Sequence, residues 1–350
     1  MKPVLFVIPL HWPWPDGIPV RAYGFMVMLG CLAAIFVALR RAKREGADRN
    51  VIWDLWMWSL IGGFVGARAF YVGLNWPQFR GSLLSVFHIW EGGLAFQGGL
   101  IGAILCAYVY MKVRKLPIAK HLDMLVAAMI LGYAFARVGC FLNGCCHGHV
   151  TDVSWAITYP AAAPVDARGT LRISPAYAAQ ESGDPRPMPE WANGLEGSRG
   201  RVLNGRLKPM WEVCELAVKR ALKYPPERER ERITERDYLK AAATGNVPPM
   251  PHTCPVHPTQ LYSAGYALII FVLLVVYAHL PHRDGQVASL FGVLYAMGRF
   301  TVEFFRGDSA SAFAGLTLFQ LVCVGIFVVF GAAWFWCQYR MSAYKRPGRK

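Results

Sequence analysis

The sequence predicts an all-α, polytopic membrane protein with seven transmembrane helices and a small extracytoplasmic head inserted between helices 4 and 5. Hydrophobic residues make up 55% of the 350 residues, and the mean hydropathy is +0.29. A hydrocarbon core of roughly 30 Å needs about 20 apolar residues per helix. Seven stretches meet this requirement: 22–39, 52–74, 92–111, 122–142, 261–280, 286–305 and 315–337.

Lysine and arginine gather in alternate loops, and this asymmetry sets the predicted orientation because short, positively charged loops stay in the cytoplasm. Basic clusters follow the spans 22–39 and 92–111 and occur again in the tail, whereas only Arg80 lies between the spans 52–74 and 92–111. We expect the N-terminus outside and the C-terminus in the cytoplasm. The net charge of +15 then reflects topology and attraction to anionic lipids, and we expect no nucleic-acid partner.

A polar segment, 159–255, interrupts the apolar pattern and defines three domains. Residues 1–158 carry four spans, 159–255 form the extracytoplasmic head, and 256–350 carry three spans and a basic cytoplasmic tail. The head begins with sequence typical of loops. Its residues 210–224 have the pattern of an amphipathic helix, and the charge-rich stretch 227–243 is a second helical candidate.

Several charged or polar residues fall at membrane depth, where a charge is costly and marks a functional site by default. They are Arg68, Gln97, Arg137, Arg299, Glu303 and, at a helix end, Arg306. Arg299 and Glu303 share one helix face, which fits an ion pair. The second, third and fourth spans offer no carboxylate at matching depth for both Arg68 and Arg137. We therefore predict an anionic ligand, and a guanidinium fork suits a phosphate.

The run that follows Arg137 contains cysteines and a histidine, so a metal site needs consideration. Zinc is disfavoured because adjacent cysteines rarely chelate one ion and no C-x-x-C partner occurs elsewhere. We predict no metal and no cofactor. A disulfide from Cys145 or Cys146 to Cys254 is an alternative if the outer compartment is oxidising, but the sequence does not fix the pairing among Cys140, Cys145, Cys146, Cys214 and Cys254.

The third span opens with five glycines, Gly92, Gly93, Gly98, Gly99 and Gly102. Glycines in membrane helices most often permit close packing. They also let a lipid headgroup approach the backbone. Both interpretations stay open at this stage.

Taken together, these motifs resemble the prolipoprotein diacylglyceryl transferases of bacterial inner membranes. The similarity covers all seven spans and leaves out only the insert. It rests on Tyr23-Gly24, Gly66-Ala67-Arg68 with Asn75-Trp76-Pro77-Gln78-Phe79, the glycine-rich opening, the Arg137 run, His257-Pro258-Thr259-Gln260-Leu261-Tyr262, Gly298-Arg299-Phe300 and Val302-Glu303-Phe304-Phe305-Arg306.

The resemblance implies transfer of the diacylglyceryl group of phosphatidylglycerol to the lipobox cysteine of a prolipoprotein, with a thioether formed and glycerol 1-phosphate released. Arg137 and Arg299 are expected to stabilise charge on the departing phosphate. Where the family has an essential histidine this chain has Gln97, which cannot take a proton at neutral pH. His257 is the substitute base that we consider, and His147 is a second. Expected substrate-binding residues are Tyr23, Arg68, Gly98, Gly99, Gly139, Asn143, Gly144, Gln260, Tyr262, Glu303 and Arg306.

The Arg137 run departs from the family pattern at two further positions. Cys140 stands where many members have asparagine, and Cys145 stands where an acid is common. Neither is implied as catalytic, because the acceptor cysteine belongs to the other substrate. Two other classes remain: a non-catalytic, transferase-like paralogue that binds lipid or lipoprotein, and a seven-helix transporter, for which no inverted repeat is evident.

Overall fold

The computed structural model describes most of the helical part of the chain and short pieces of the insert. The described residues are 4–8, 18–80, 83–87, 93, 95–160, 162–164, 171–173, 201–203, 206–208, 219, 235–243, 253–306, 311–313 and 315–344.

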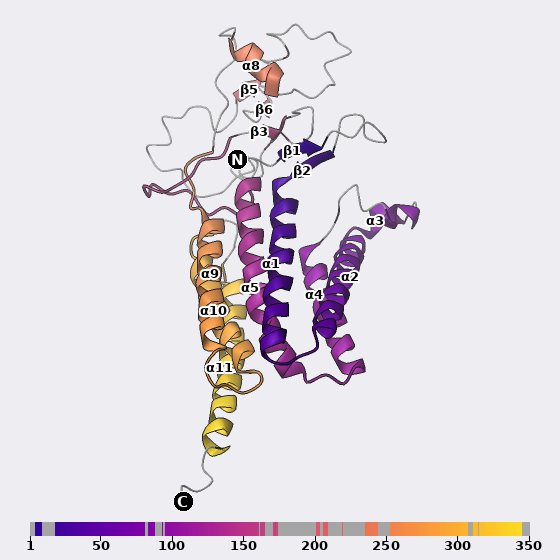
Figure 1. The fold of residues 1–350 in the computed structure, drawn as a ribbon. Helices are drawn as coiled ribbons and strands as arrows, with labels where there is room; N and C mark the ends of the chain where they lie inside the picture. The colour runs from indigo at the N-terminus through magenta and orange to yellow at the C-terminus, as the bar shows by residue number, and fades with distance from the viewer. Residues whose placement is uncertain are drawn as a thin grey trace, which may run out of the picture. The chain divides into compact units, whose positions relative to one another are not determined.

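Long helices dominate the described residues (Figure 1). Each predicted span has a matching helix: α1 (Ala22–Arg44), α2 (Arg49–Leu74), α4 (Phe96–Val113), α5 (Ile118–Asn143), α9 (Thr259–Tyr277), α10 (Gln286–Glu303) and α11 (Leu318–Tyr344). Helix α1 continues past its apolar span, so Arg40, Arg41, Lys43 and Arg44 lie in the helix and not in the predicted loop. Five helices, α1, α2, α5, α9 and α11, are long and apolar enough to cross a membrane. The chain is therefore a mostly helical, polytopic membrane protein.

Short elements accompany these helices. The N-terminal residues form a hairpin of β1 (Val4–Ile8) and β2 (Ile18–Arg21), which sequence reasoning did not anticipate. A short helix α3 (Trp76–Phe79) and a 3-10 turn η1 (Leu83–Phe87) follow α2. Another hairpin, β7 (Ser311–Phe313) with β8 (Leu316–Thr317), precedes α11.

The insert is described only in part. It contains the hairpins β3 (Ala162–Pro164) with β4 (Leu171–Ile173) and β5 (Arg201–Leu203) with β6 (Arg206–Lys208). Strand β3 lies in a stretch that we expected to be loop. Helix α8 (Glu235–Ala243) occupies the C-terminal half of the second predicted helix. Apart from residue 219, the predicted helix at 210–224 lies outside the described residues, and so does Cys214.

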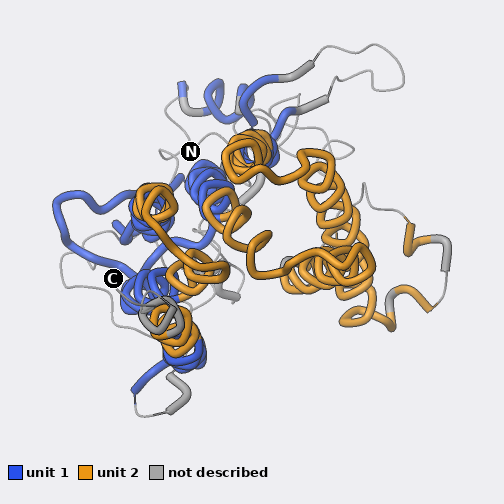
Figure 2. Tube along the Cα trace, turned by 60° about the horizontal axis from the view of Figure 1, so that its bottom comes forward, with its two compact units in different colours: residues 1–31, 130–270, 293–329 blue, residues 32–129, 271–292, 330–350 orange. Residues whose placement is uncertain are grey.

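The chain divides into two compact units, coloured separately in Figure 2. Unit 1 comprises residues 1–31, 130–270 and 293–329; unit 2 comprises residues 32–129, 271–292 and 330–350.

Unit 2 is built around the close approach of α2 and α4, which lie side by side in Figure 1. A Cβ added at Gly102 would lie 2.2 Å from the Gly62 carbonyl oxygen, and one at Gly98 would lie 2.3 Å from the Gly66 carbonyl oxygen. No side chain fits at these separations. Close packing therefore accounts for these glycines of the α4 opening. A core cluster that includes Ile52, Leu55 and Met124 is also in this unit.

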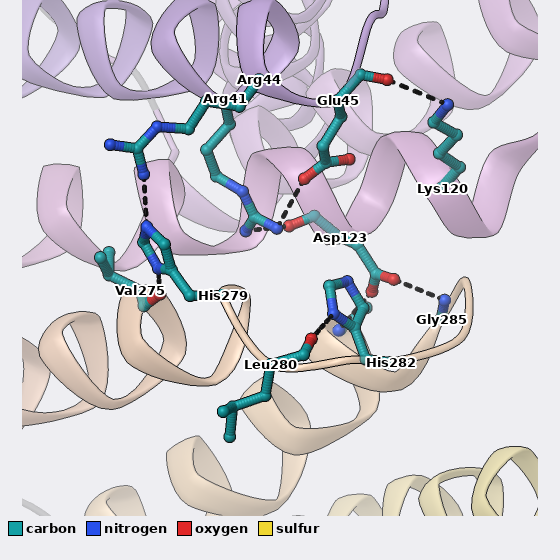
Figure 3. Close-up of polar contacts among 11 residues, drawn as sticks. Arg41, Arg44, Glu45, Lys120, Asp123, Val275, His279, Leu280, His282 and Gly285 are labelled. Carbon is teal, nitrogen blue, oxygen red and sulfur yellow. Dashed lines mark hydrogen bonds and ion pairs between the residues drawn. The ribbon is translucent and has the colours of Figure 1, made fainter. Parts of the chain in front are cut away.

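Polar residues of unit 2 form a second cluster, the Asp123 cluster, made of Arg41, Glu45 and Asp123 (Figure 3). The buried Asp123 carboxylate accepts hydrogen bonds from the Gly285 amide at 2.6 Å and the Ala288 amide at 2.7 Å, at the start of α10. Arg41 donates to the Asp123 carbonyl at 2.5 Å and pairs with Glu45 at 2.9 Å. A carboxylate at a helix N-terminus satisfies exposed amides and opposes the helix dipole, so this cluster has a structural role.

Candidate active site

The end of α5 turns the chain sharply. Gly144 has a φ of 73°, its amide donates to the Phe141 carbonyl, and the Cys145 amide donates to the Cys140 carbonyl. This pair of bonds is the Schellman cap, in which the glycine position needs a left-handed conformation. The cap gives Gly144 a structural reason for being glycine, and it folds the next residues back over the helix end.

Cys146 continues the turn with a φ of 59°, which is uncommon for a residue with a side chain. As a result the sulfurs of Cys140, Cys145 and Cys146 all lie within 4.8 Å of one another. The sequence spacing disfavoured zinc because adjacent cysteines rarely chelate one ion, and the spacing alone does not include the turn that this cap produces. All three thiols are free, so a bridge from Cys145 or Cys146 to Cys254 is not formed.

Two arginines lie near these sulfurs. The charges of Arg137 and Arg306 both act on Cys146. Hydrogen bonds with Cys140 and then Cys145 are the largest causes that lower the pKa of the Cys146 thiol, and the two arginines lower it further. Within this group of thiols, Cys146 is therefore the one whose ionised form is favoured.

Arg137 is half-buried in α5 and stacks on an aromatic ring. Its guanidinium lies 4.7 Å from the centre of the Tyr133 ring, and the Tyr133 hydroxyl is 3.0 Å from that of Tyr266. Among the described residues, Arg137 forms no ion pair with a carboxylate. Arg137 also forms a side-chain hydrogen bond with Tyr133, and the several N–H donors of a guanidinium group leave others to bind an anionic ligand.

Glu303 is buried, with 3% of its surface exposed, and takes part in a different arrangement. It forms an ion pair with Arg299 on the same helix face, and Arg306 Nε lies 3.9 Å from Glu303 Oε2. Thr317 donates to Oε1 at 3.2 Å. The ion pair expected from the spacing of Arg299 and Glu303 is confirmed.

These groups share neighbours. Arg137 and Arg299 both act electrostatically on the Tyr295 hydroxyl, as Arg137 and Arg306 both do on Cys146. We call Arg137, Arg299, Glu303 and Arg306 the arginine cluster. Counted over these four described residues, it holds three guanidinium groups and one carboxylate, a formal excess of two positive charges.

The start of α9 holds the loop that carries the cysteines. Thr259 donates to the Cys146 carbonyl and Gln260 to the Cys145 carbonyl, each at 2.7 Å. Gln260 also donates to the Tyr159 hydroxyl at 3.1 Å. Burial is the largest cause that raises the pKa of Tyr159, to about 12, so this phenol stays neutral.

Gly148 is needed for the same loop to close. A Cβ there would lie 2.4 Å from the Phe305 carbonyl oxygen and 2.6 Å from the His257 Cβ. The Gly148 amide donates to the His257 carbonyl, and the His257 amide donates to the His149 carbonyl. The position of His257 is therefore fixed by main-chain pairing.

His257 and Tyr262 line an apolar pocket of about 690 Å³ together with Trp155, Tyr266, Met297 and Phe305, among others. His257 Nδ1 lies 3.1 Å from the Tyr262 hydroxyl, which accepts a 2.7 Å bond from Trp155. Burial, and then the charge of His149, lower the pKa of His257. The imidazole is therefore neutral at pH 7 and able to accept a proton.

Tyr23 and Gly139 lie where α1 meets α5. A Cβ at Gly139 would lie 3.2 Å from the Tyr23 ring and 3.2 Å from Met26 Cβ. Tyr23 is also close enough to Arg137 and the three thiols to interact with their charges. Asn143 forms a side-chain hydrogen bond with Cys145. In unit 1 the structure thus places the predicted residues Tyr23, Arg137, Gly139, Asn143 and Gly144 around the cysteines.

The remaining predicted residues belong to unit 2. Arg68 is buried and donates to the carbonyls of Ser85, Val86 and Gly93 at 2.8–3.0 Å, so it holds the segment after α3. Gly98 and Gly99 face α2, where they allow close packing. Gln97 is exposed in the first turn of α4. Contact of these residues with substrate stays a prediction.

Sequence reasoning missed several residues that shape the site. Tyr133, which holds Arg137, lies four residues before it on α5, and an aromatic at that spacing was the available signal. Gly148 lies in the run that follows Arg137, and Thr259 lies in the motif that begins at His257, so both were close to residues that we predicted. Trp155 gave no signal, because its contact with Tyr262 joins distant parts of the chain.

Comparison with known proteins places this arrangement in a family. The family model for prolipoprotein diacylglyceryl transferase matches residues 11–336. The chain belongs to this family. It is 35% identical over 313 residues to the phosphatidylglycerol–prolipoprotein diacylglyceryl transferase of Finegoldia magna, covering 89% of each chain.

Two further phosphatidylglycerol–prolipoprotein diacylglyceryl transferases are less similar to this chain. The Clostridium tetani protein is 24% identical, with 94% of this chain and 96% of the relative covered. The Rhodopirellula baltica protein is 28% identical, and the match spans 78% of this chain but 59% of that longer relative. Family membership and the apolar helices together make this a bacterial membrane protein.

Proposed function

We propose that the chain transfers the diacylglyceryl group of phosphatidylglycerol to the lipobox cysteine thiol of a prolipoprotein. A carbon–sulfur bond forms, the carbon–oxygen bond to phosphate breaks, and glycerol 1-phosphate leaves with the electron pair. Family membership supports this reaction, and the relatives' names favour it over a non-catalytic paralogue. The observation that carries it is the excess of guanidinium groups over carboxylates in the arginine cluster.

The arginine cluster suits the phosphate. Negative charge develops on the leaving oxygen in the transition state, and fixed donors in a water-poor site stabilise that charge strongly. Arg137, which has no ion pair with a described carboxylate, is the residue that we place on the phosphate. Glu303 forms an ion pair with Arg299, and this ion pair orients the guanidinium group of Arg299.

The acceptor thiol must lose a proton before it attacks, because the thiolate is the nucleophile and a free cysteine has a pKa near 8.5. We propose His257 as the general base, because Gln97 stands where the family has its essential histidine. Its neutral imidazole lines the apolar pocket, which offers walls for the hydrophobic residues of a lipobox or for acyl chains. Tyr262, at hydrogen-bond distance from Nδ1, orients the ring.

The membrane arrangement completes the proposal. Helices α4 and α10 join the five long spans, which gives seven in the bacterial inner membrane, with the N-terminus outside and the C-terminus in the cytoplasm. Residues 159–255 then form a head on the outer side, between the segments 1–158 and 256–350. The loop with the cysteines and His257 lies on that outer side, where exported prolipoproteins arrive.

A direct transfer assay tests the function. The purified full chain, mixed with labelled phosphatidylglycerol and a lipobox peptide, is expected to yield a thioether-linked lipopeptide and glycerol 1-phosphate. A peptide with serine in place of the lipobox cysteine is the control and should stay unmodified. Absence of product under conditions where another family member is active would refute the proposal, and complementation of transferase-depleted cells gives an independent readout.

A further inference from the structure

The three thiols at the end of α5 lie outside the chemistry derived so far. Cys140 is 8% exposed, and Cys145 and Cys146 are half-buried. The left-handed backbone at Cys146 carries a cost for a residue with a side chain, and its effect is to bring two adjacent sulfurs toward a third. Strained backbone of this kind clusters at active sites and ligand-binding sites.

The separations suit a metal ion. Zinc binds thiolate sulfur at about 2.3 Å in tetrahedral geometry, which places two ligand sulfurs about 3.8 Å apart. The three sulfurs lie within 4.8 Å of one another, so shifts of less than about 1 Å bring them into coordination. Such a shift would disturb the long contact from Cys145 Sγ to the Cys140 carbonyl, at 3.7 Å, and the hydrogen bond between Asn143 and Cys145.

The nearby charges also favour a metal ion bound by the three thiolates. Three thiolates and one divalent cation carry a net charge of −1, and Arg137 and Arg306 act on Cys146 from nearby. A buried charge needs such compensation. Among the described residues, no histidine, aspartate, glutamate or further cysteine joins the three thiols in this group. Three protein ligands with an open fourth position are typical of catalytic zinc sites.

We propose that Cys140, Cys145 and Cys146 bind one thiophilic d¹⁰ cation, Zn²⁺ being the probe, and that its fourth position takes the acceptor thiol. The second half of this proposal rests on the proposed function. The acceptor thiol gives its proton to His257, the proposed general base, when its sulfur takes that position, because a coordinating thiol is deprotonated. This supplies a thiolate in a chain that has Gln97 where its family has a histidine.

Metal binding is tested first, without any activity measurement. The full chain is stripped with a chelator and titrated with Zn²⁺ against a chromophoric competitor, and Co²⁺ substitution is followed by the thiolate-to-cobalt absorption band. We expect one equivalent of zinc and a cobalt band typical of three thiolates. Cys145→Ser and Cys146→Ser should each weaken binding by more than about 100-fold, beyond the cost of an outer-shell change. Cys31→Ser, a cysteine of α1, is the matched control and should bind as the unmodified chain does.

Lack of stoichiometric zinc in the unmodified chain would overturn the site, and so would equal binding by the double variant Cys145→Ser/Cys146→Ser. The unmodified chain answers this question even if a variant fails to fold.

The transfer assay then tests the role. At pH 7 about 3% of a thiol with a pKa near 8.5 is ionised, so zinc should raise the rate by at most about 30-fold at pH 7. The gain should vanish near pH 9.5, where the thiol is ionised without a metal. Equal rates with and without bound zinc at pH 7 would overturn the activating role. Bound zinc without transfer under any condition would overturn the proposed function and leave the metal site standing.

Discussion

The two polar clusters of this protein differ in how their charges are matched. In the Asp123 cluster of unit 2, the buried carboxylate receives two backbone amides and Arg41 has both Glu45 and a carbonyl as partners. In the arginine cluster of unit 1, Arg299 and Arg306 pair with the carboxylate of Glu303, whereas Arg137 rests on an aromatic ring. A cluster whose charges are matched internally stabilises a fold, whereas one with excess charge is suited to a ligand of opposite sign.

Arg68 makes the comparison sharper. The sequence alone makes the same prediction for Arg68 and Arg137, because it offers no carboxylate at matching depth for both. Arg68 directs its donors to three main-chain carbonyls, whereas Arg137 stacks on Tyr133. The lesson is that the absence of an acidic partner does not make an arginine a ligand-binding residue, since carbonyl oxygens satisfy it equally well.

The largest effect is expected when one arginine of each cluster is replaced by glutamine. Arg137→Gln should lower kcat for transfer by about 100- to 1,000-fold, the usual cost of losing one donor to developing negative charge. Its thermal midpoint in detergent should change little. Arg41→Gln should lower the thermal midpoint and leave the rate per folded molecule unaltered. A near-normal rate in Arg137→Gln would remove Arg137 from the site and with it the contrast between the clusters.

Asp123→Asn should destabilise the protein by about 1–3 kcal/mol, because an amide cannot accept from both backbone donors without leaving a buried group unsatisfied. The measurement is chemical or thermal unfolding in detergent. Asp284→Asn, an exposed residue of the same loop, is the control and should be neutral. An equally small change in both variants would mean that the Asp123 cluster does not stabilise the start of α10.

Close packing of α2 against α4 predicts a further contrast. Gly102→Ala places a Cβ 2.2 Å from the Gly62 carbonyl oxygen and should destabilise by about 1–3 kcal/mol, as overpacking does. Gly73→Ala has no neighbour within 4 Å of the added atom and should be neutral or stabilising, since alanine favours helix. Similar thermal midpoints for the two variants would contradict the packing role of the α4 glycines.

The smallest effect concerns pH. Because burial and the charge of His149 lower the pKa of His257, the acid limb of kcat/KM should lie below the ordinary histidine value of about 6.5. His149→Gln removes one cause and should move the limb upward, though burial keeps it below that value. Stability should fall as the pH drops through this range, because protonation is easier in the unfolded chain. A limb unchanged by His149→Gln would argue against His257 as the base.

Much of the helical framework was predictable from local sequence. The lengths of the apolar stretches located the seven long helices to within a few residues at most ends, because the number of apolar residues that a bilayer requires is counted directly along the sequence. The hairpin of β1 and β2 was missed since prolines obscured its alternation, and α1 ran on through arginines that the charge rule had placed in a loop. The pair Arg299 and Glu303 was predicted correctly, because residues four apart on a helix must share a face.

The sequence by itself determined the family and the mostly helical membrane class, because these depend on composition, spacing and motif order. Only the tertiary structure decided which arginine donates to main-chain carbonyls, which one stacks on an aromatic ring, and which glycine caps a helix. It also decided that three cysteines meet at one point. These outcomes depend on long-range hydrogen bonds and on the left-handed turns at Gly144 and Cys146, where the direction of a side chain does not follow from its place in the sequence.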